Sequence, residues 1–160
     1  MERANSKIII FTSPSGAGKS TITRHLLQTF PFLAFSISAT TRNRRQGEEH
    51  GKDYYFLSVD EFKENIAANA FLEYEQVYEG LYYGTLVSEI DRLNNADKVA
   101  ILDIDVDGAR NVKQRFGDSV LTVFVAPPNK QVLIDRLKKR GTESEEELQN
   151  WQPLVDYEKC

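Results

Sequence analysis

The chain has 160 residues, 41% of them hydrophobic, which suffices for one buried core and is short for two independent domains. Its formal net charge of −4 gives no general attraction to nucleic acid or to anionic membranes. Cys160 is the single cysteine, which excludes an intramolecular disulfide and a cysteine-rich metal site. No N-terminal apolar stretch is as long as a signal peptide or a membrane span. We therefore expect one cytoplasmic domain, with no membrane and no nucleic-acid partner.

Short strands and helices alternate along the chain. Apolar or β-branched runs indicate buried strands, and segments with apolar residues at helical spacing lie between them. The expected strands are 7–12, 34–38, 99–103 and 120–125, and the expected helices are 19–29, 107–116 and 129–140. This alternation predicts an α/β fold with a parallel sheet covered by helices.

The segment 42–85 interrupts this alternation. It is rich in glycine, tyrosine and charged residues. Ser58 and Glu61 have the spacing of a capping box, which predicts that a helix begins after Ser58. We interpret the segment as an insertion that lies off the main sheet.

The sequence SPSGAGKST stands between the first expected strand and the first expected helix. It nearly matches the phosphate-binding pattern GxxxxGK[S/T], in which backbone N–H groups and a helix N-terminus bind an anion. Lys19 can reach the β- and γ-phosphates, and Ser20 can bind Mg²⁺. Ser13 replaces the first glycine of the pattern, which is tolerable if its φ is negative. We predict an ATP or GTP site made by Ser13, Pro14, Ser15, Gly16, Ala17, Gly18, Lys19, Ser20 and Thr21.

Two further groups of residues are candidates for ligand binding, and the first of them would form a second phosphate site. In the insertion, Arg42 and Arg45 stand near Tyr54, and arginine side chains can bind a phosphate in a bidentate manner. Alone, this stretch would rather indicate a solvated charged loop with aromatic anchors. Asp103 ends an expected strand, where carboxylates face the ligand crevice of open α/β sheets, and could hold Mg²⁺. Asp105 could be a ligand or equally the N-cap of the following helix.

These stretches, together with FLEY, YYGT and RLKKRGTESEEE, resemble one family, the guanylate kinases. The resemblance extends over residues 7–147. It implies a single domain over 1–160 with a P-loop NTPase-type parallel sheet flanked by helices. It divides the domain into a core (about 1–38 and 86–135), a GMP-binding subdomain (about 39–85) and a short lid (about 136–152). Because the two phosphates must meet in line, we expect the GMP-binding subdomain and the lid to close over the site, with hinges near 39–42 and 85–87.

The resemblance also implies a reaction and its residues. The reaction is ATP-dependent phosphorylation of GMP or dGMP to GDP or dGDP, in purine nucleotide metabolism, with Mg²⁺ as the cofactor of ATP. The GMP-binding positions are Ser38, Arg42, Arg45, Tyr54, Glu73, Tyr83, Thr85 and Asp105. The positions that handle the transferring phosphate are Lys19, Arg136 and Arg140, together with Arg42, and those for Mg²⁺ are Ser20 and Asp103.

The sequence departs from the family beyond Ser13. Arg44 replaces a proline between the two phosphate-binding arginines, and Trp151 stands where the family has an arginine that faces the ATP phosphates. The chain also ends where the family continues with a further strand and helix. We therefore expect reduced activity in this chain.

Two other classes of protein compete with the kinase. One is a guanylate-kinase-like module that binds protein partners without catalysis. Such modules typically lose the phosphate loop, whereas Gly16, Gly18 and Lys19 are all present here. The other is a nucleic-acid-binding ATPase, which would need a basic track that this acidic chain lacks. The oligomeric state does not follow from the sequence.

Overall fold

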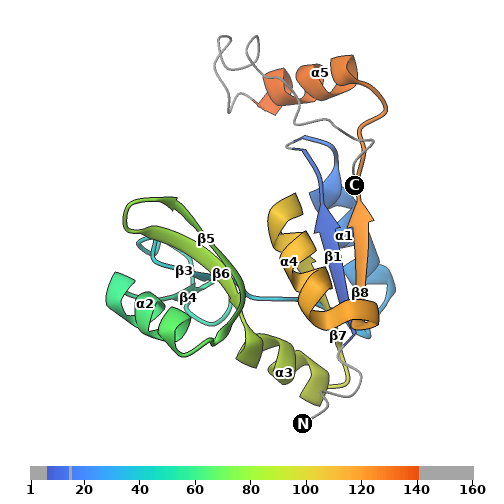
Figure 1. The fold of residues 1–160 in the computed structure, drawn as a ribbon. Coiled ribbons are helices and arrows are strands. Elements are labelled where there is room, and N and C mark those ends of the chain that lie inside the picture. The colour runs from blue at the N-terminus through green and yellow to red at the C-terminus, as the bar shows by residue number, and fades with distance from the viewer. Residues whose placement is uncertain (1–6, 15, 141–160) are drawn as a thin grey trace.

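The computed structural model describes residues 7–14 and 16–140. The core is a parallel sheet that includes β1, β7 and β8 (Figure 1). Its full strand order is β2-β7-β1-β8. Its strands are β1 (Ile8–Thr12), β2 (Leu33–Phe35), β7 (Val99–Asp103) and β8 (Val120–Phe124). The predicted α/β class is confirmed.

Helices cover both faces of the core sheet, as the continuous apolar sequence of β1 requires. Ile8 and Ile10 point to one face, where they pack with residues of α3 (Val87–Asn95) and α4 (Val106–Phe116). Phe11 points to the other face and packs in a cluster with Leu26 of α1 (Lys19–Thr29). A short 3₁₀ turn, η1 (Gly117–Ser119), leads from α4 into β8.

The insertion forms a second, smaller sheet beside the core (Figure 1). Its strand order is β4-β3-β6-β5, with mixed directions. The elements are β3 (Ala39–Thr40), β4 (Tyr55–Phe56), α2 (Val59–Ala67), β5 (Phe71–Tyr78) and β6 (Leu81–Leu86). Phe62 of α2 is fully buried and stacks on Phe71 and Tyr82, with ring centroids 4.3 and 5.1 Å away. The insertion therefore has its own apolar core.

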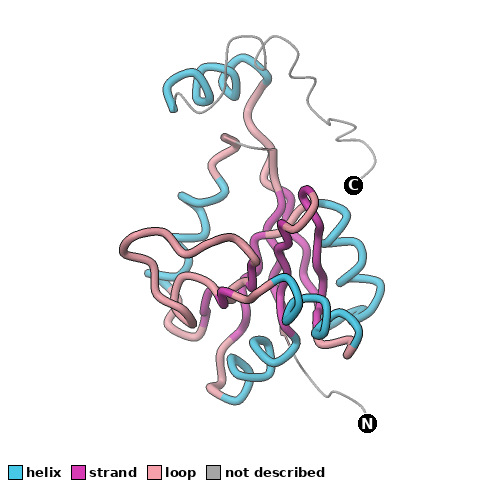
Figure 2. Tube along the Cα trace, turned by 90° about the vertical axis from the view of Figure 1, so that its left-hand side faces the viewer, coloured by secondary structure: helices cyan, strands magenta, loops and turns pink. Residues whose placement is uncertain are grey.

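The last described helix, α5 (Lys130–Arg140), lies beyond the carboxyl ends of the core strands, and Figure 2 shows the same placement from the side. It is continuous across the boundary of 135 and 136 that we placed between core and lid. The rest of the expected lid lies outside the described residues. None of the helices that the structure describes is long and apolar enough to cross a membrane.

In the core, one strand end and one helix differ from the prediction by more than a residue. The strand expected over 34–38 ends at Phe35. Ser36 still donates its N–H to Ile101 of β7, but the N–H of Ile37 is bound by the Glu89 side chain instead of a strand. The helix α3 was not predicted at all. It lies at the beginning of the second core segment, where the sequence pattern predicted no helix.

The capping box at the start of α2 gives a stability prediction. The Ser58 hydroxyl accepts from Glu61 N at 3.1 Å, and the Glu61 carboxylate accepts from Ser58 N at 2.7 Å. Ser58→Ala should lower the free energy of unfolding by about 1 kcal/mol, because one N–H of the first turn loses its partner. Urea unfolding measures the change. Ser88→Ala is the matched control, since Ser88 is exposed in the first turn of α3 and is not its N-cap. Equal destabilisation by both substitutions would contradict the capping role.

Candidate active site

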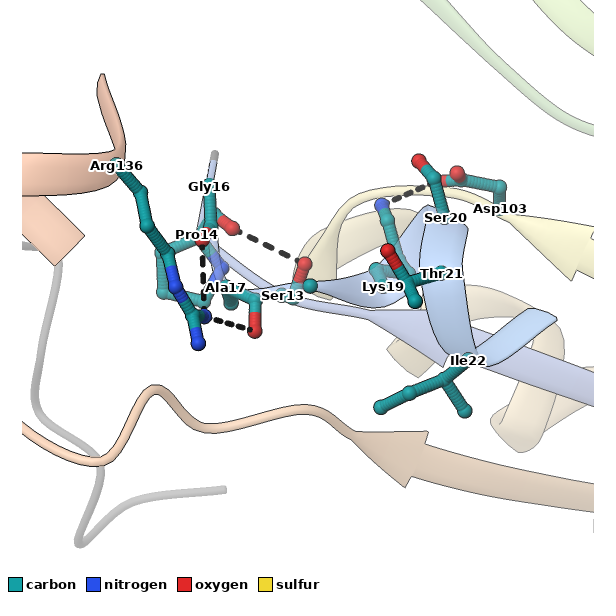
Figure 3. A pocket seen from close by; sticks show the side chains of 11 residues that line it. Ser13, Pro14, Gly16, Ala17, Lys19, Ser20, Thr21, Ile22, Asp103 and Arg136 are labelled. Carbon is teal, nitrogen blue, oxygen red and sulfur yellow. Dashed lines mark hydrogen bonds and ion pairs between the residues drawn. The ribbon is translucent and has the colours of Figure 1, made fainter. Parts of the chain in front are cut away.

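The glycine-rich loop between β1 and α1 borders a pocket of about 850 Å³ (Figure 3). Gly16 and Gly18 have φ values of 82° and 103°, which glycine adopts without steric cost. Gly18 is the N-cap of α1, and no side chain caps this helix. The first N–H groups of α1 are therefore available to an anion in the pocket.

Ser13 satisfies the condition that we set for replacing the first glycine of the loop. Within the described residues, the non-glycine residues with positive φ are Asn69 and Asp97, so Ser13 is not among them. Its hydroxyl donates to the carbonyl of Pro14 at 3.0 Å. Of the predicted loop residues, Ser15 lies outside the described ones, and the others line the pocket.

Lys19 and Asp103 form an ion pair at the carboxyl edge of the core sheet (Figure 3). Lys19 begins α1, Asp103 ends β7, and Ser20 borders the same pocket. A carboxylate and a hydroxyl are hard oxygen donors that suit Mg²⁺, which commonly takes one or two carboxylates and completes its shell with water and phosphate oxygens. Among the residues that the structure describes, no group of three His, Cys, Asp or Glu side chains could hold a metal ion. The residues present therefore fit Mg²⁺ only as a partner of bound phosphate.

Helix α5 packs on the glycine-rich loop. Leu133 and Leu137 are each 1% exposed, and a Cβ added at Gly16 would lie 3.0 Å from a Leu137 methyl carbon. Arg136 donates to the carbonyls of Gly16 and Ala17 at 3.4 and 3.1 Å (Figure 3). Arg136 thus borders the pocket, as its predicted role requires. The helix α5 ends at Arg140, whose side chain lies outside the described part.

Arg42, the arginine predicted to bind the GMP phosphate, is paired with a carboxylate. It donates to the two oxygens of Glu48 at 2.7 and 3.0 Å, and the backbone N–H of Arg45 donates to the same carboxylate at 2.7 Å. The Arg42 hydrogen bonds, followed by that from Arg45, lower the pKa of Glu48 to about 2. Glu48 in turn raises the pKa of Arg42 above its usual range. This carboxylate occupies the donors that a phosphate would use.

Aromatic side chains surround this arginine. The Arg42 guanidinium carbon lies 5.2 Å from the ring centroid of Tyr54, and the rings of Tyr54 and Tyr83 are 6.2 Å apart. The structure therefore brings together Arg42, Tyr54 and Tyr83. The side chain of Arg45 is exposed, as is that of Arg44.

The residues predicted to recognise guanine come from the inserted sheet and from the N-terminus of a core helix. Glu73 of β5 is opposite Thr85 of β6, and Asp105 caps α4 by accepting from Gly108 N at 2.6 Å. A Cβ added at Gly108 would lie 3.0 Å from the Asp105 carboxylate and 3.6 Å from that of Glu73. The two carboxylates thus converge at the N-terminus of α4. Burial raises the pKa of Glu73, and the negative charge of Asp105 raises it further. Hydrogen bonds from Thr85 lower this pKa but do not cancel the increase.

Our sequence analysis missed two acidic residues, Glu48 and Glu89. Glu48 had a weak signal, since it is an acid three residues after Arg45 in a turn rich in arginine. Glu89 had no signal in the sequence, because an acid in the first turn of a helix is normally a solvated residue that stabilises the helix through its dipole. Here it is 1% exposed.

A phosphate loop between strand and helix, on a parallel sheet with an inserted sheet, defines a P-loop nucleotide-binding protein of the α/β class. Residues 5–155 match the family model described as guanylate kinase. The chain belongs to the guanylate kinase family.

Individual relatives agree with this assignment. The guanylate kinase of Porphyromonas gingivalis is 49% identical over 144 residues, which are 89% of this chain and 77% of that protein. The guanylate kinase of Salinibacter ruber is 51% identical over 152 residues, 94% of this chain and 80% of that protein. The crystal structure of the guanylate kinase from Anaplasma phagocytophilum superposes with a TM-score of 0.64 at 29% identity, covering 84% of this chain and 65% of that one.

The pairing of Glu48 with Arg42 predicts a pH effect on stability. Because the folded pKa of Glu48, about 2, is below its ordinary value of 4.5, the stabilisation is complete above pH 4.5 and is lost as the pH falls toward 2. Unfolding free energies of the wild type and Glu48→Gln should therefore differ at neutral pH and converge in acid. Glu64→Gln, at an exposed position of α2, is the control, and its difference from the wild type should not change with pH. A Glu48→Gln difference that is independent of pH would contradict the ion pair.

Proposed function

We propose that this chain transfers the γ-phosphoryl group of ATP to GMP or dGMP, yielding ADP and GDP or dGDP, as a step of purine nucleotide metabolism in the cytoplasm. One observation carries the choice of acceptor. Glu73, from the inserted sheet, and Asp105, the N-cap of a core helix, converge at the N-terminus of α4. The family membership and the pocket at the glycine-rich loop support the choice of donor.

Guanine recognition follows from hydrogen-bond complementarity. The Watson–Crick edge of guanine presents the N1–H and N2–H donors, and the Glu73 and Asp105 carboxylates are acceptors. The same edge of adenine would place a lone pair against a carboxylate, and unpaired polar groups are costly in a buried site. Ser38 and Thr85 carry hydroxyls that can donate to guanine O6. Burial raises the pKa of Glu73, and the N–H donors of a bound guanine would favour its ionised form.

The GMP phosphate would bind in the cluster of Arg42, Tyr54 and Tyr83, with Arg45 turned toward it. To bind there, the phosphate must replace or share Glu48 on the Arg42 guanidinium. A dianion offers more negative charge than one carboxylate, so the exchange is favourable when GMP is present. The acceptor phosphate is thereby held with one oxygen free to attack.

On the donor side, the loop N–H groups and Lys19 would hold the ATP phosphates. Lys19 would leave Asp103 for the β- and γ-phosphates, and Asp103 could then hold Mg²⁺ together with Ser20. When bound, Mg²⁺ neutralises charge on the phosphates and orients them. Arg136 borders the pocket and can move from the loop carbonyls to the transferring group, and Arg140 follows it four residues later in the same helix. Such transfer depends on in-line positioning and cations more than on a general base.

The first test concerns the acceptor base. In calorimetric titrations GMP should bind and AMP should not. Glu73→Gln should weaken GMP binding by about 1 to 3 kcal/mol, the usual value of a bidentate contact to a base, and leave ATP binding unchanged. Glu79→Gln, at an exposed position beside the β5–β6 turn, is the control. Equal binding of GMP and AMP would refute guanine recognition, and a loss of ATP binding alone would mean that Glu73 is misassigned.

The second test concerns the donor site. Lys19→Met keeps the length of the side chain and removes its charge. It should lower kcat by about a hundredfold to a thousandfold, the usual cost of removing one group that stabilises developing charge. Steady-state formation of ADP in the presence of GMP measures it, while calorimetry should show GMP binding preserved. Lys63→Met, exposed on α2, should behave as the wild type. Unchanged turnover in Lys19→Met would show that the glycine-rich loop does not take part in the reaction as proposed.

A further inference from the structure

Glu89 is a buried carboxylate that the reaction does not use. It is 1% exposed, in the first turn of α3. Its oxygens accept from Ile37 N at 3.0 Å, from the Tyr55 hydroxyl at 2.8 Å, and from Arg92 Nε and Nη2 at 2.8 and 2.9 Å. A buried charge is costly unless it is paired and hydrogen-bonded, and this one is both. Despite its burial, these bonds hold the pKa of Glu89 below its ordinary value.

The position of Glu89 in the fold is unusual, because it joins the two places where the chain passes between the sheets. At the first crossing, Ser36 is still bonded to β7 of the core, and β3 of the inserted sheet begins at Ala39. At the second, β6 ends at Leu86 and α3 begins with the next residue. Glu89, two residues into α3, binds Ile37 in the middle of the first crossing. Figure 1 shows α3 at this junction.

The same carboxylate closes a ring of hydrogen bonds around Ser38. Glu89 binds Ile37 N on one side of Ser38. On the other side, the backbone N–H of Tyr55 donates to the Ser38 carbonyl at 2.9 Å, and the Tyr55 hydroxyl returns to Glu89. The backbone of Ser38 is thus fixed from both directions by one acidic side chain and one tyrosine.

We propose that Glu89 is a positioning residue for guanine recognition. By tying the two crossings together, it sets the spacing between Ser38, at the first crossing, and Thr85, just before the second. These are the two hydroxyls assigned to guanine O6, so the proposal rests on the proposed function. Arg92, whose side chain is 52% exposed, neutralises the carboxylate from the solvent side. The ATP pocket at the glycine-rich loop has no residue in this ring.

A purely structural Glu89 and a positioning Glu89 make different predictions. If it only stabilises the junction, its loss lowers the melting temperature and affects both nucleotides or neither. If it positions Ser38, its loss weakens GMP binding selectively. The experiment therefore measures KM for GMP, KM for ATP, kcat and the melting temperature in parallel, with calorimetric titration of GMP.

Two variants are tested. Glu89→Gln keeps the shape of the side chain and removes its charge. Tyr55→Phe keeps the aromatic side chain and removes the hydrogen bond from the Tyr55 hydroxyl to Glu89. Glu89→Gln should raise KM and Kd for GMP by about tenfold to a hundredfold, the effect of losing a hydrogen bond to a charged group, and leave KM for ATP at the wild-type value. Tyr55→Phe should act in the same direction to a smaller extent. Asp91→Asn, an exposed acid on the same helix, is the control.

Unchanged GMP affinity in both variants, with or without a lower melting temperature, would overturn the proposal, as would equal weakening of ATP. If Glu89→Gln does not fold, the result for Tyr55→Phe decides. A wild type that does not bind GMP would refute the proposed function itself, which separates that failure from failure of the positioning role.

Discussion

Two of the cations that are assigned to phosphate in this chain, Lys19 and Arg42, are held by carboxylates of the protein. Lys19 pairs with Asp103 at the edge of the core sheet, and Arg42 pairs with Glu48 in the insertion. Unpaired cations gathered at one site would repel one another, and the pairs keep each side chain near its place while neutralising it. In the proposed function a nucleotide phosphate, which offers more negative charge to the same donors, would replace each carboxylate.

Charge alone does not bring the two halves of the site together, since they belong to separate sheets. In the proposed function, the carboxyl edge of β1 and β7 would carry the donor site, and the mixed sheet of the insertion would carry most of the acceptor site. Asp105 is the exception, because it caps a core helix and meets Glu73 of the insertion. Guanine would therefore be bound by the core and the insertion at once. A base that both sheets bind would favour the closed arrangement in which the two phosphates are in line.

The parts that local sequence patterns encode were predicted well. Strand, glycine-rich loop and helix around Lys19 follow from spacing and glycine chemistry, and the capping box at Ser58 marked the start of α2 to the residue. The two-residue strands of the insertion were not predicted, since β3 is defined by pairing with distant β6, and β4 by pairing with β3. Glu89 could not be distinguished from a solvated helical acid, because its burial depends on Ile37 and Tyr55, which are far away in the sequence.

The central claim is that this chain moves phosphate from ATP to guanine nucleotides in particular. The most direct measurement gives the protein ATP labelled at the γ-phosphorus, with GMP and AMP present in equal amounts and Mg²⁺ in excess, and follows the label. The account predicts that the label appears at the β-phosphorus of GDP and that AMP is left unchanged. Label divided between GDP and ADP, or released only as inorganic phosphate, would contradict it.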